Sequence, residues 1–167
     1  MQKLLLSALA FLLILSCSTE KRASPPMNAK GTIAGTSIEV QYGAPSVKGR
    51  KVFGELVPYG TIWRTGANEN TRIALSADML IANQALPAGS YGLLTTPGET
   101  TWKVHFNAQD DAWGAYSYDS GKDVLVVECV TSPLSDLQEQ MLFEVKEDGL
   151  HLKWEFTHLF IPMAPAP

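Results

Sequence analysis

The chain has 167 residues, of which 46% are hydrophobic and 18% are charged, and its formal net charge is −4. This length suits one domain, and this balance is typical of a globular protein and not of a disordered one. The acidic balance argues against a nucleic-acid surface, because binding to phosphates needs clustered Lys and Arg. We therefore expect one globular domain with no nucleic-acid partner.

The N-terminus has the pattern of an export signal. Lys3 precedes an apolar run over residues 4–15, which is shorter than the roughly 20 residues of a membrane-spanning helix. Ile14-Leu15-Ser16-Cys17 resembles a bacterial lipobox, in which the cysteine is acylated and becomes the new N-terminus. The alternative is a plain secretory signal with a chance cysteine. We expect residues 1–16 to be a lipoprotein signal peptide and Cys17 to carry the lipid.

Residues 17–31 are polar and contain prolines without periodicity, which predicts a flexible tether. Glu20 is the one acidic residue close behind Cys17, and it lies beside Lys21 and Arg22. Some lipoproteins are sent to the cell surface by acidic residues at this place. The pattern here therefore favours an exported, lipid-anchored protein on the outer membrane that faces the periplasm.

Short alternating runs predict β-strands through the rest of the chain. They lie at residues 37–42, 71–75, 79–81, 90–95, 102–107, 124–131, 141–146 and 150–156. The run at 124–131 is apolar on both faces, which predicts a central strand, and residues 132–140 are expected to be a connection with at most one helical turn. Glu147-Asp148-Gly149 predicts a tight hairpin turn.

No segment after the signal shows a sustained helical period. Many short strands with turn signals between them predict an all-β fold with little or no helix. We expect a single antiparallel β-sandwich over residues 32–162, jelly-roll-like or a partly closed barrel, followed by a disordered tail at 163–167.

Four motifs resemble one family of proteins. They are Pro45-Ser46-Val47-Lys48-Gly49-Arg50-Lys51, Trp63-Arg64-Thr65-Gly66-Ala67-Asn68-Glu69, Leu86-Pro87-Ala88-Gly89-Ser90-Tyr91 and Trp113-Gly114-Ala115-Tyr116. The chain resembles, over about residues 37–162, the family catalogued as domain of unknown function 2911. Its members are mostly exported proteins or lipoproteins of Gram-negative bacteria. The resemblance implies no reaction and no catalytic residues. His105 stands where an aliphatic residue is expected in the family.

The glycine-rich loop between the first two strands carries the strongest candidate site residues. Arg64 offers a planar fork of donors that suits a carboxylate, while Asn68 and Glu69 can bind hydroxyls or amides of a ligand. The structural alternative is that Arg64 pairs with Glu69 and that Asn68 stabilises a turn. Lys48 and Arg50 can hold an anion, or they are solvated surface charges.

Aromatic residues make a second candidate site. Trp113 and Tyr116, in a polar loop over residues 108–122, can form a platform for a sugar ring or a peptide. The alternative is that Trp63 and Trp113 plug the open ends of the sandwich, and this is the expectation for Trp63. His105, His151 and His158 lack the spacing of metal ligands, with His105 and His151 on polar strand faces. We expect no metal and no cofactor. Cys129 is expected to be a buried, inert thiol.

Two functional hypotheses follow from these residues. The first is a non-enzymatic, lipid-anchored protein that binds a glycan, a peptide or an envelope protein through the two loops. The second is a hydrolase-like enzyme of envelope material that uses Glu69, or an Asp near Asp110, as acid or base beside Arg64. A binding protein needs an aromatic surface with convergent donors, while an enzyme needs a titratable group with a shifted pKa in a cleft.

Overall fold

The computed structural model describes residues 22–167, and this part of the chain is an all-β domain, as predicted. Its one antiparallel sheet of nine strands has the order β1-β2-β3-β6-β7-β8-β9-β4-β5. The strands are β1 (Pro26–Ile33), β2 (Thr36–Gly43), β3 (Arg72–Leu75), β4 (Met79–Ile81), β5 (Gln84–Leu86), β6 (Gly89–Thr96), β7 (Thr101–Asn107), β8 (Asp123–Lys146) and β9 (Gly149–Pro165). Between residues 22 and 167 the one helical element is the short 3₁₀ turn η1 (Ser120–Lys122).

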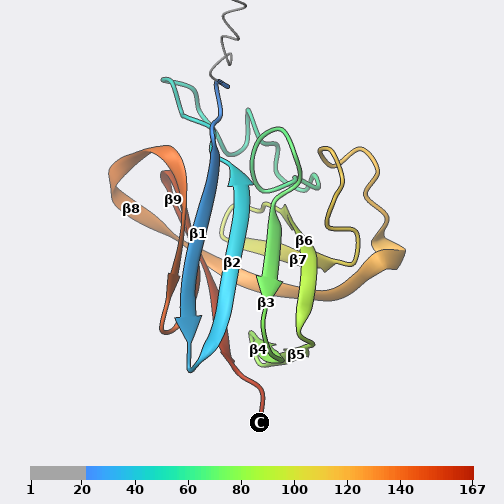
Figure 1. The fold of residues 1–167 in the computed structure, drawn as a ribbon. Coiled ribbons are helices and arrows are strands. Elements are labelled where there is room, and N and C mark those ends of the chain that lie inside the picture. The colour runs from blue at the N-terminus through green and yellow to red at the C-terminus, as the bar shows by residue number, and fades with distance from the viewer. Residues whose placement is uncertain (1–21) are drawn as a thin grey trace, which may run out of the picture.

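The sheet folds back on itself in a sandwich-like arrangement. Strands β1, β2, β3 and β6 lie in front, and β8 crosses behind them (Figure 1). β1 contacts β8 and β9, although these strands are far from it in the sheet order. Gly31 allows one such close approach, because a Cβ atom at this position would lie 2.8 Å from Val145 Cβ. One core is thus enclosed between the two layers.

Local alternation predicted several strands correctly. In β2, Ile38, Val40 and Tyr42 are buried, while Ser37 and Gln41 face outward. The hairpin between β8 and β9 is confirmed as well, with Lys146 paired to Gly149 across the expected turn. These elements are set by contacts between residues close in sequence, and the period of two is sufficient to define them.

Strand β8 differs from the prediction in two ways. The connection expected at residues 132–140 is wrong, because this stretch belongs to the strand. Its backbone bonds to the loop after β2, where the Val47 amide donates to the Glu139 carbonyl at 2.8 Å. The burial expected on both faces of 124–131 is also wrong, since Val130 is 68% exposed while Val127 is buried. β8 lies between β7 and β9 in the sheet, but one of its faces is open.

The ordered domain extends beyond the expected boundaries at both ends. Strand β1 begins at Pro26, inside the segment that the sequence assigned to a tether, and it pairs with β2 along its whole length. Strand β9 reaches Pro165, inside the expected tail, where it pairs with Met79 of β4. The expected signal peptide at 1–16 and the lipidation site Cys17 lie outside the described residues. Among residues 22–167, no helix has the length and apolar character needed to cross a membrane.

Four aromatic rings lie at the centre of the core. Phe53 packs edge-on against Trp102 with ring centroids 4.7 Å apart, and Trp63 stacks on Trp154 at 5.8 Å. Trp63 thus brings the loop between β2 and β3 into the core. The loop is therefore anchored by a large apolar side chain.

Three polar or reactive residues of the sheet are buried, Cys129 as expected and the two histidines against expectation. Cys129 is a free, buried thiol, and burial raises its pKa to about 11. His105 and His151 were expected on polar faces but are buried. His151 bonds to both His158 and Asp148, at 2.9 Å each. Within residues 22–167, no group of three or more His, Cys, Asp or Glu is arranged to hold a metal ion.

Candidate functional site

The loop between β2 and β3 is held in shape by hydrogen bonds to itself and to the end of β2. The Trp63 indole donates to the Gly66 carbonyl at 3.1 Å, and the Thr71 hydroxyl donates to the Thr65 carbonyl at 2.8 Å. The Ala67 amide donates to the Gly43 carbonyl at 3.1 Å. Because these bonds brace the backbone, the side chains that follow Trp63 are displayed from a fixed frame.

Four of the residues expected to bind a ligand meet in one groove of about 150 Å³, which we call the end groove. It is lined by Arg64, Asn68, Trp113, Gly114 and Tyr116. Two loops that are far apart in the sequence come together here, since Glu69 and Trp113 form an antiparallel bridge. Trp113 is 61% exposed and Tyr116 is 92% exposed. Both rings therefore offer apolar faces to solvent beside a guanidinium and an amide.

Arg64 has unused hydrogen-bonding capacity. Its Nε atom is buried and has no hydrogen-bond partner among residues 22–167. A buried donor without a partner costs about 1–3 kcal/mol. The guanidinium of Arg64 lines the groove, and a carboxylate or a sugar hydroxyl has the right chemistry to bind it. This makes Arg64 the residue of the end groove with the strongest reason to bind a ligand.

The expected pairing of Arg64 with Glu69 is wrong, because Glu69 bonds to Arg22 instead, at 2.7 Å. The backbone amide of Glu69, and then the Arg22 guanidinium, lower the pKa of the Glu69 carboxyl. Glu69 is therefore ionised at neutral pH, which does not suit a general acid. Asn68 adopts a left-handed backbone at φ 65° and donates from its side chain to the Ser24 carbonyl at 3.2 Å.

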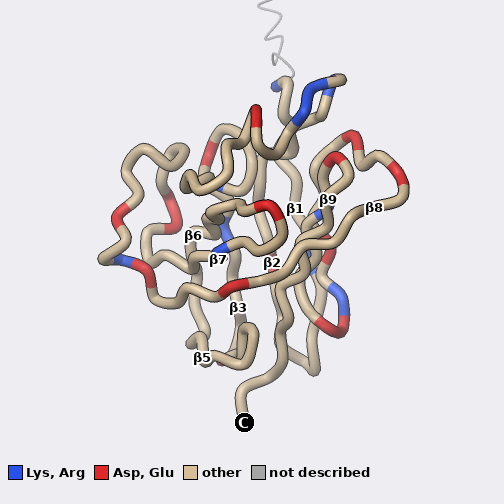
Figure 2. The backbone as a smooth tube through the Cα atoms, turned by 180° about the vertical axis from the view of Figure 1, so that it is seen from behind, with Lys and Arg blue, Asp and Glu red and all other residues tan. Residues whose placement is uncertain are grey.

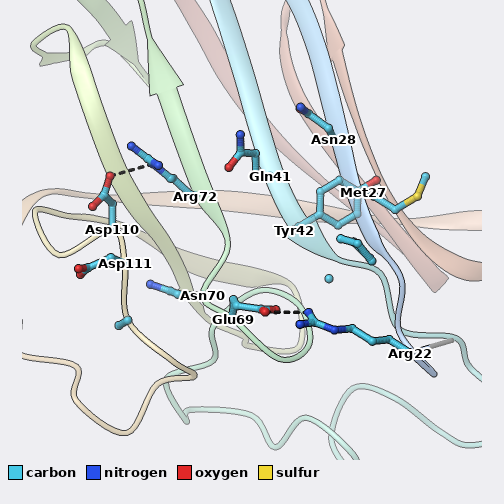
Figure 3. A pocket seen from close by; sticks show the side chains of 13 residues that line it. Arg22, Met27, Asn28, Gln41, Tyr42, Glu69, Asn70, Arg72, Asp110 and Asp111 are labelled. Carbon is cyan, nitrogen blue, oxygen red and sulfur yellow. Dashed lines mark hydrogen bonds and ion pairs between the residues drawn. The ribbon is translucent and has the colours of Figure 1, made fainter. Parts of the chain in front are cut away.

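A larger groove of about 480 Å³, the strand groove, is lined in part by neighbouring residues of the same two segments. Its polar lining includes two ion pairs, Arg22 with Glu69 and Arg72 with Asp110, the second at 2.8 Å (Figure 3). Asn70 follows Glu69 directly, and the backbone amide of Asn70 donates to the Ala112 carbonyl at 3.0 Å. Residues 69–70 and 110–112 thus line the strand groove, while Asn68, Trp113 and Gly114 of the same two segments line the end groove.

Asn70 is the most unusual residue of the strand groove. It is 7% exposed, and its Oδ1 atom is buried without a hydrogen-bond partner in the described part of the chain. Figure 3 shows its side chain between the two ion pairs. Gly92 leaves room for it, since a Cβ at Gly92 would lie 2.7 Å from the Asn70 amide nitrogen. Asn70 is therefore packed tightly, with a buried carbonyl oxygen that has no hydrogen-bond partner among residues 22–167.

Lys48 and Arg50 do not join the end groove. The Arg50 guanidinium donates to the Ser46 carbonyl at 2.6 Å and to the Val47 carbonyl at 2.9 Å, so it braces its own loop. Arg50 lines a separate groove of about 280 Å³, which shares Arg64 with the end groove. The backbone of Lys48 is left-handed, and its amide bonds to the Glu139 carboxylate at 3.0 Å. An anion site formed by the two cations is not supported by these contacts.

Charged residues are dispersed over the domain and do not gather on one face (Figure 2). Of the residues in the strand groove, sequence reasoning named only Glu69 and the region of Asp110 as functional candidates. Asn70 and Arg72 lie at a loop end and on an outward strand position, and neither place is unusual in the sequence. The pairing of β3 with β2 and β6 brings them to the groove. The pattern of residues along the chain does not show which strands pair, so it could not place Asn70 and Arg72 in the groove.

The comparisons with known proteins identify a family and nothing beyond it. The family described as Protein of unknown function (DUF2911) matches residues 24–163. No curated protein and no solved structure matches the chain. The match extends from just before β1 to near the end of β9, and it includes every residue of the end groove. Because the match covers most of the chain, this protein belongs to the DUF2911 family.

Proposed function

We propose that this protein is a lipid-anchored binding protein of the cell envelope, and that it holds its ligand in the end groove. The observation that carries the proposal is the meeting of Arg64, Asn68, Trp113 and Tyr116 in one groove. Exposed aromatic faces beside a few polar groups are the usual means of binding a sugar ring, since the ring stacks and its hydroxyls bond to the polar groups. We therefore propose a glycan as the ligand, and a carboxylate on it would suit the guanidinium of Arg64.

The strand groove extends the proposed binding surface. A chain of sugar units that starts at Trp113 can continue past residues 68–70 into the strand groove, where Arg72 and Asp110 offer polar groups. Acid catalysis by Glu69 has less support, because its carboxyl is half exposed, paired with Arg22 and lowered in pKa. Binding therefore explains more of the observed geometry than hydrolysis through Glu69 and Arg64.

The first prediction concerns the two exposed aromatic residues. In a glycan array with a peptide array in parallel, Trp113→Ala and Tyr116→Ala should each weaken binding by about tenfold, since a lost stacking contact is worth up to roughly 1.5 kcal/mol. Both side chains are exposed, so stability should change by no more than about 0.5 kcal/mol. Phe156→Ala is the control, because Phe156 is 52% exposed and lines neither groove. If all three variants bind as tightly as the unaltered protein, the proposal is refuted. If binding is lost on the peptide array alone, the ligand is a peptide and not a glycan.

The second prediction concerns anchoring. Cys17→Ser should move the protein from the membrane fraction to the soluble envelope fraction, because acylation needs the thiol and multiple chains hold a protein stably in a bilayer. Fractionation followed by immunoblotting measures this directly. Ser16→Ala is the matched control and should leave the protein in the membrane. Retention of the Cys17→Ser variant in the membrane fraction would argue against lipid at this position.

A further inference from the structure

A chain of hydrogen bonds crosses three neighbouring strands on the face of the sheet that lies beneath residues 108–122. His105 of β7 is at its centre. His105 Nε2 lies 3.1 Å from the Thr96 hydroxyl at the end of β6, and His105 Nδ1 lies 3.0 Å from Asp123 Oδ2 at the start of β8. A carboxylate accepts hydrogen bonds, which assigns the ring proton to Nδ1 and leaves the lone pair of Nε2 to accept from Thr96. The three side chains are thus ordered as nucleophile, base and orienting carboxylate.

Asp123 is held firmly in this position. The Asn107 amide donates to its Oδ1 at 2.8 Å, and the Tyr118 hydroxyl donates to its Oδ2 at 2.5 Å. The side chains of His105 and Asp123 are 10% and 8% exposed, so water competes little with these bonds. Burial and the adjacent carboxylate raise the pKa of Tyr118, which therefore remains a donor. Supporting contacts of this kind hold a base in the geometry that proton transfer requires.

Thr96 connects the buried hydrogen bonds of His105 and Asp123 to the surface of the domain. It is partly buried and lines an open groove of about 490 Å³, which we call the threonine groove, together with Gly60, Pro97, Gly98, Thr101, Lys103 and Glu128. None of these residues lines the end groove or the strand groove. Lys103 supplies a cation that can stabilise negative charge developing on a bound oxygen. The threonine groove therefore holds a hydroxyl, a base behind it and a cation beside it.

We propose that Thr96, His105 and Asp123 form a second site, which hydrolyses esters through an acyl group on Thr96. The Thr96 oxygen attacks the carbonyl carbon while its proton passes to His105 Nε2, and the carbonyl electron pair moves to the oxygen near Lys103. Collapse of this intermediate breaks the ester bond, and the departing alcohol takes the proton from His105. Water then attacks acyl-Thr96 with the same proton transfers, which releases the carboxylic acid and restores Thr96.

The class of substrate follows from the nucleophile. A threonine hydroxyl is secondary and crowded by its methyl group, so a good leaving group is needed. An ester expels an alcohol more readily than an amide expels an amine. The threonine groove is open to solvent, which suits an ester with a short acyl group and a larger alcohol. In this site Thr96 and His105 are the catalytic residues, and Asp123 is a positioning residue because it acts through His105.

The test uses the full-length protein in detergent and p-nitrophenyl acetate as the probe. We expect release of nitrophenol and, after an acid quench, one acetyl group on the peptide that contains Thr96. Thr96→Ser should retain activity and carry the acetyl group at the same position, while Thr96→Val and His105→Gln should lose at least about 10²-fold in kcat/KM. Asp123→Asn should lower kcat and leave KM unchanged, because it disturbs the tautomer of His105 and not the groove.

Thr32→Ala is the control, since Thr32 of β1 offers an exposed strand hydroxyl outside the threonine groove, and its rate should equal that of the unaltered protein. Circular dichroism checks the fold of each variant. If His105→Gln does not fold, the comparison of Thr96→Ser with Thr96→Val decides alone, because both keep the strand position. Equal rates for these two variants, or an acetyl group on Thr101 or a lysine, would overturn the proposal. Binding of a glycan at the end groove is independent of this outcome.

Discussion

Trp102→Ala should destabilise the domain by about 3–5 kcal/mol, which is the usual cost of removing a large buried aromatic side chain. Trp102 is 1% exposed. It packs edge-on against Phe53 with ring centroids 4.7 Å apart and against Trp63 at 6.3 Å. The substitution removes these contacts and leaves a cavity between the layers of the sandwich that the surrounding strands fill only in part. Urea denaturation should show a lower midpoint with an unchanged slope.

Trp113→Ala is the control for this measurement, since it removes the same side chain from a position that is 61% exposed. Its effect on stability should stay within about 0.5 kcal/mol. The two tryptophans thus have opposite expected effects, with Trp102 important for stability and Trp113 for binding. A cost below about 1 kcal/mol for Trp102→Ala would contradict the central position of this ring in the core.

Gly43→Ala should destabilise the domain by about 3 kcal/mol or more and should also displace the loop that carries Arg64. A Cβ atom at Gly43 would lie 2.1 Å from the Ala67 carbonyl oxygen, and this neighbour is backbone that cannot rotate away. The Ala67 amide bonds to the Gly43 carbonyl at 3.1 Å, so the clash falls on the contact that seats the loop. Overpacking usually costs about 1–3 kcal/mol, and a backbone clash lies at the upper end. Urea denaturation measures the loss, and limited proteolysis of residues 61–70 reports displacement of the loop.

Gly35→Ala is the matched control for the second measurement. Its φ is 89° and no atom lies within 4 Å of the position of the added Cβ. The cost should therefore be only that of a left-handed backbone, about 1–2 kcal/mol, without faster cleavage of the loop. If Gly43→Ala behaves like Gly35→Ala in both measurements, the loop is not seated on the end of β2 as described.

Residues close in sequence explain where prediction succeeded. The alternation of Ile38, Val40 and Tyr42 defines β2, and a two-residue turn defines the hairpin before Gly149. Prediction failed at residues 132–140, because their polar side chains lie in solvent while their backbone bonds to a loop about 90 residues away. Apolar and polar side chains alternate only where one face of a strand is buried and the other is exposed. A strand with both faces exposed to solvent therefore shows no alternation in its sequence.

The candidate sites divide in the same way. Arg64, Asn68, Trp113 and Tyr116 stand out by residue type in glycine-bearing loops, and the fold brings them into one groove. Asn70 was not singled out, and neither was the role of Arg22 as the partner of Glu69. His105 was assigned to a polar strand face, and its burial depends on the segment that ends before Asp123.

The sequence by itself determined the all-β class, most strand positions and the family to which the chain belongs. Only the tertiary structure decided which strands are neighbours, which carboxylates Arg22 and Arg72 meet, and that Thr96, His105 and Asp123 form one chain of hydrogen bonds. The physical reason is that alternation and turn chemistry depend on neighbours along the chain, whereas the order of strands depends on how all the apolar faces are buried together.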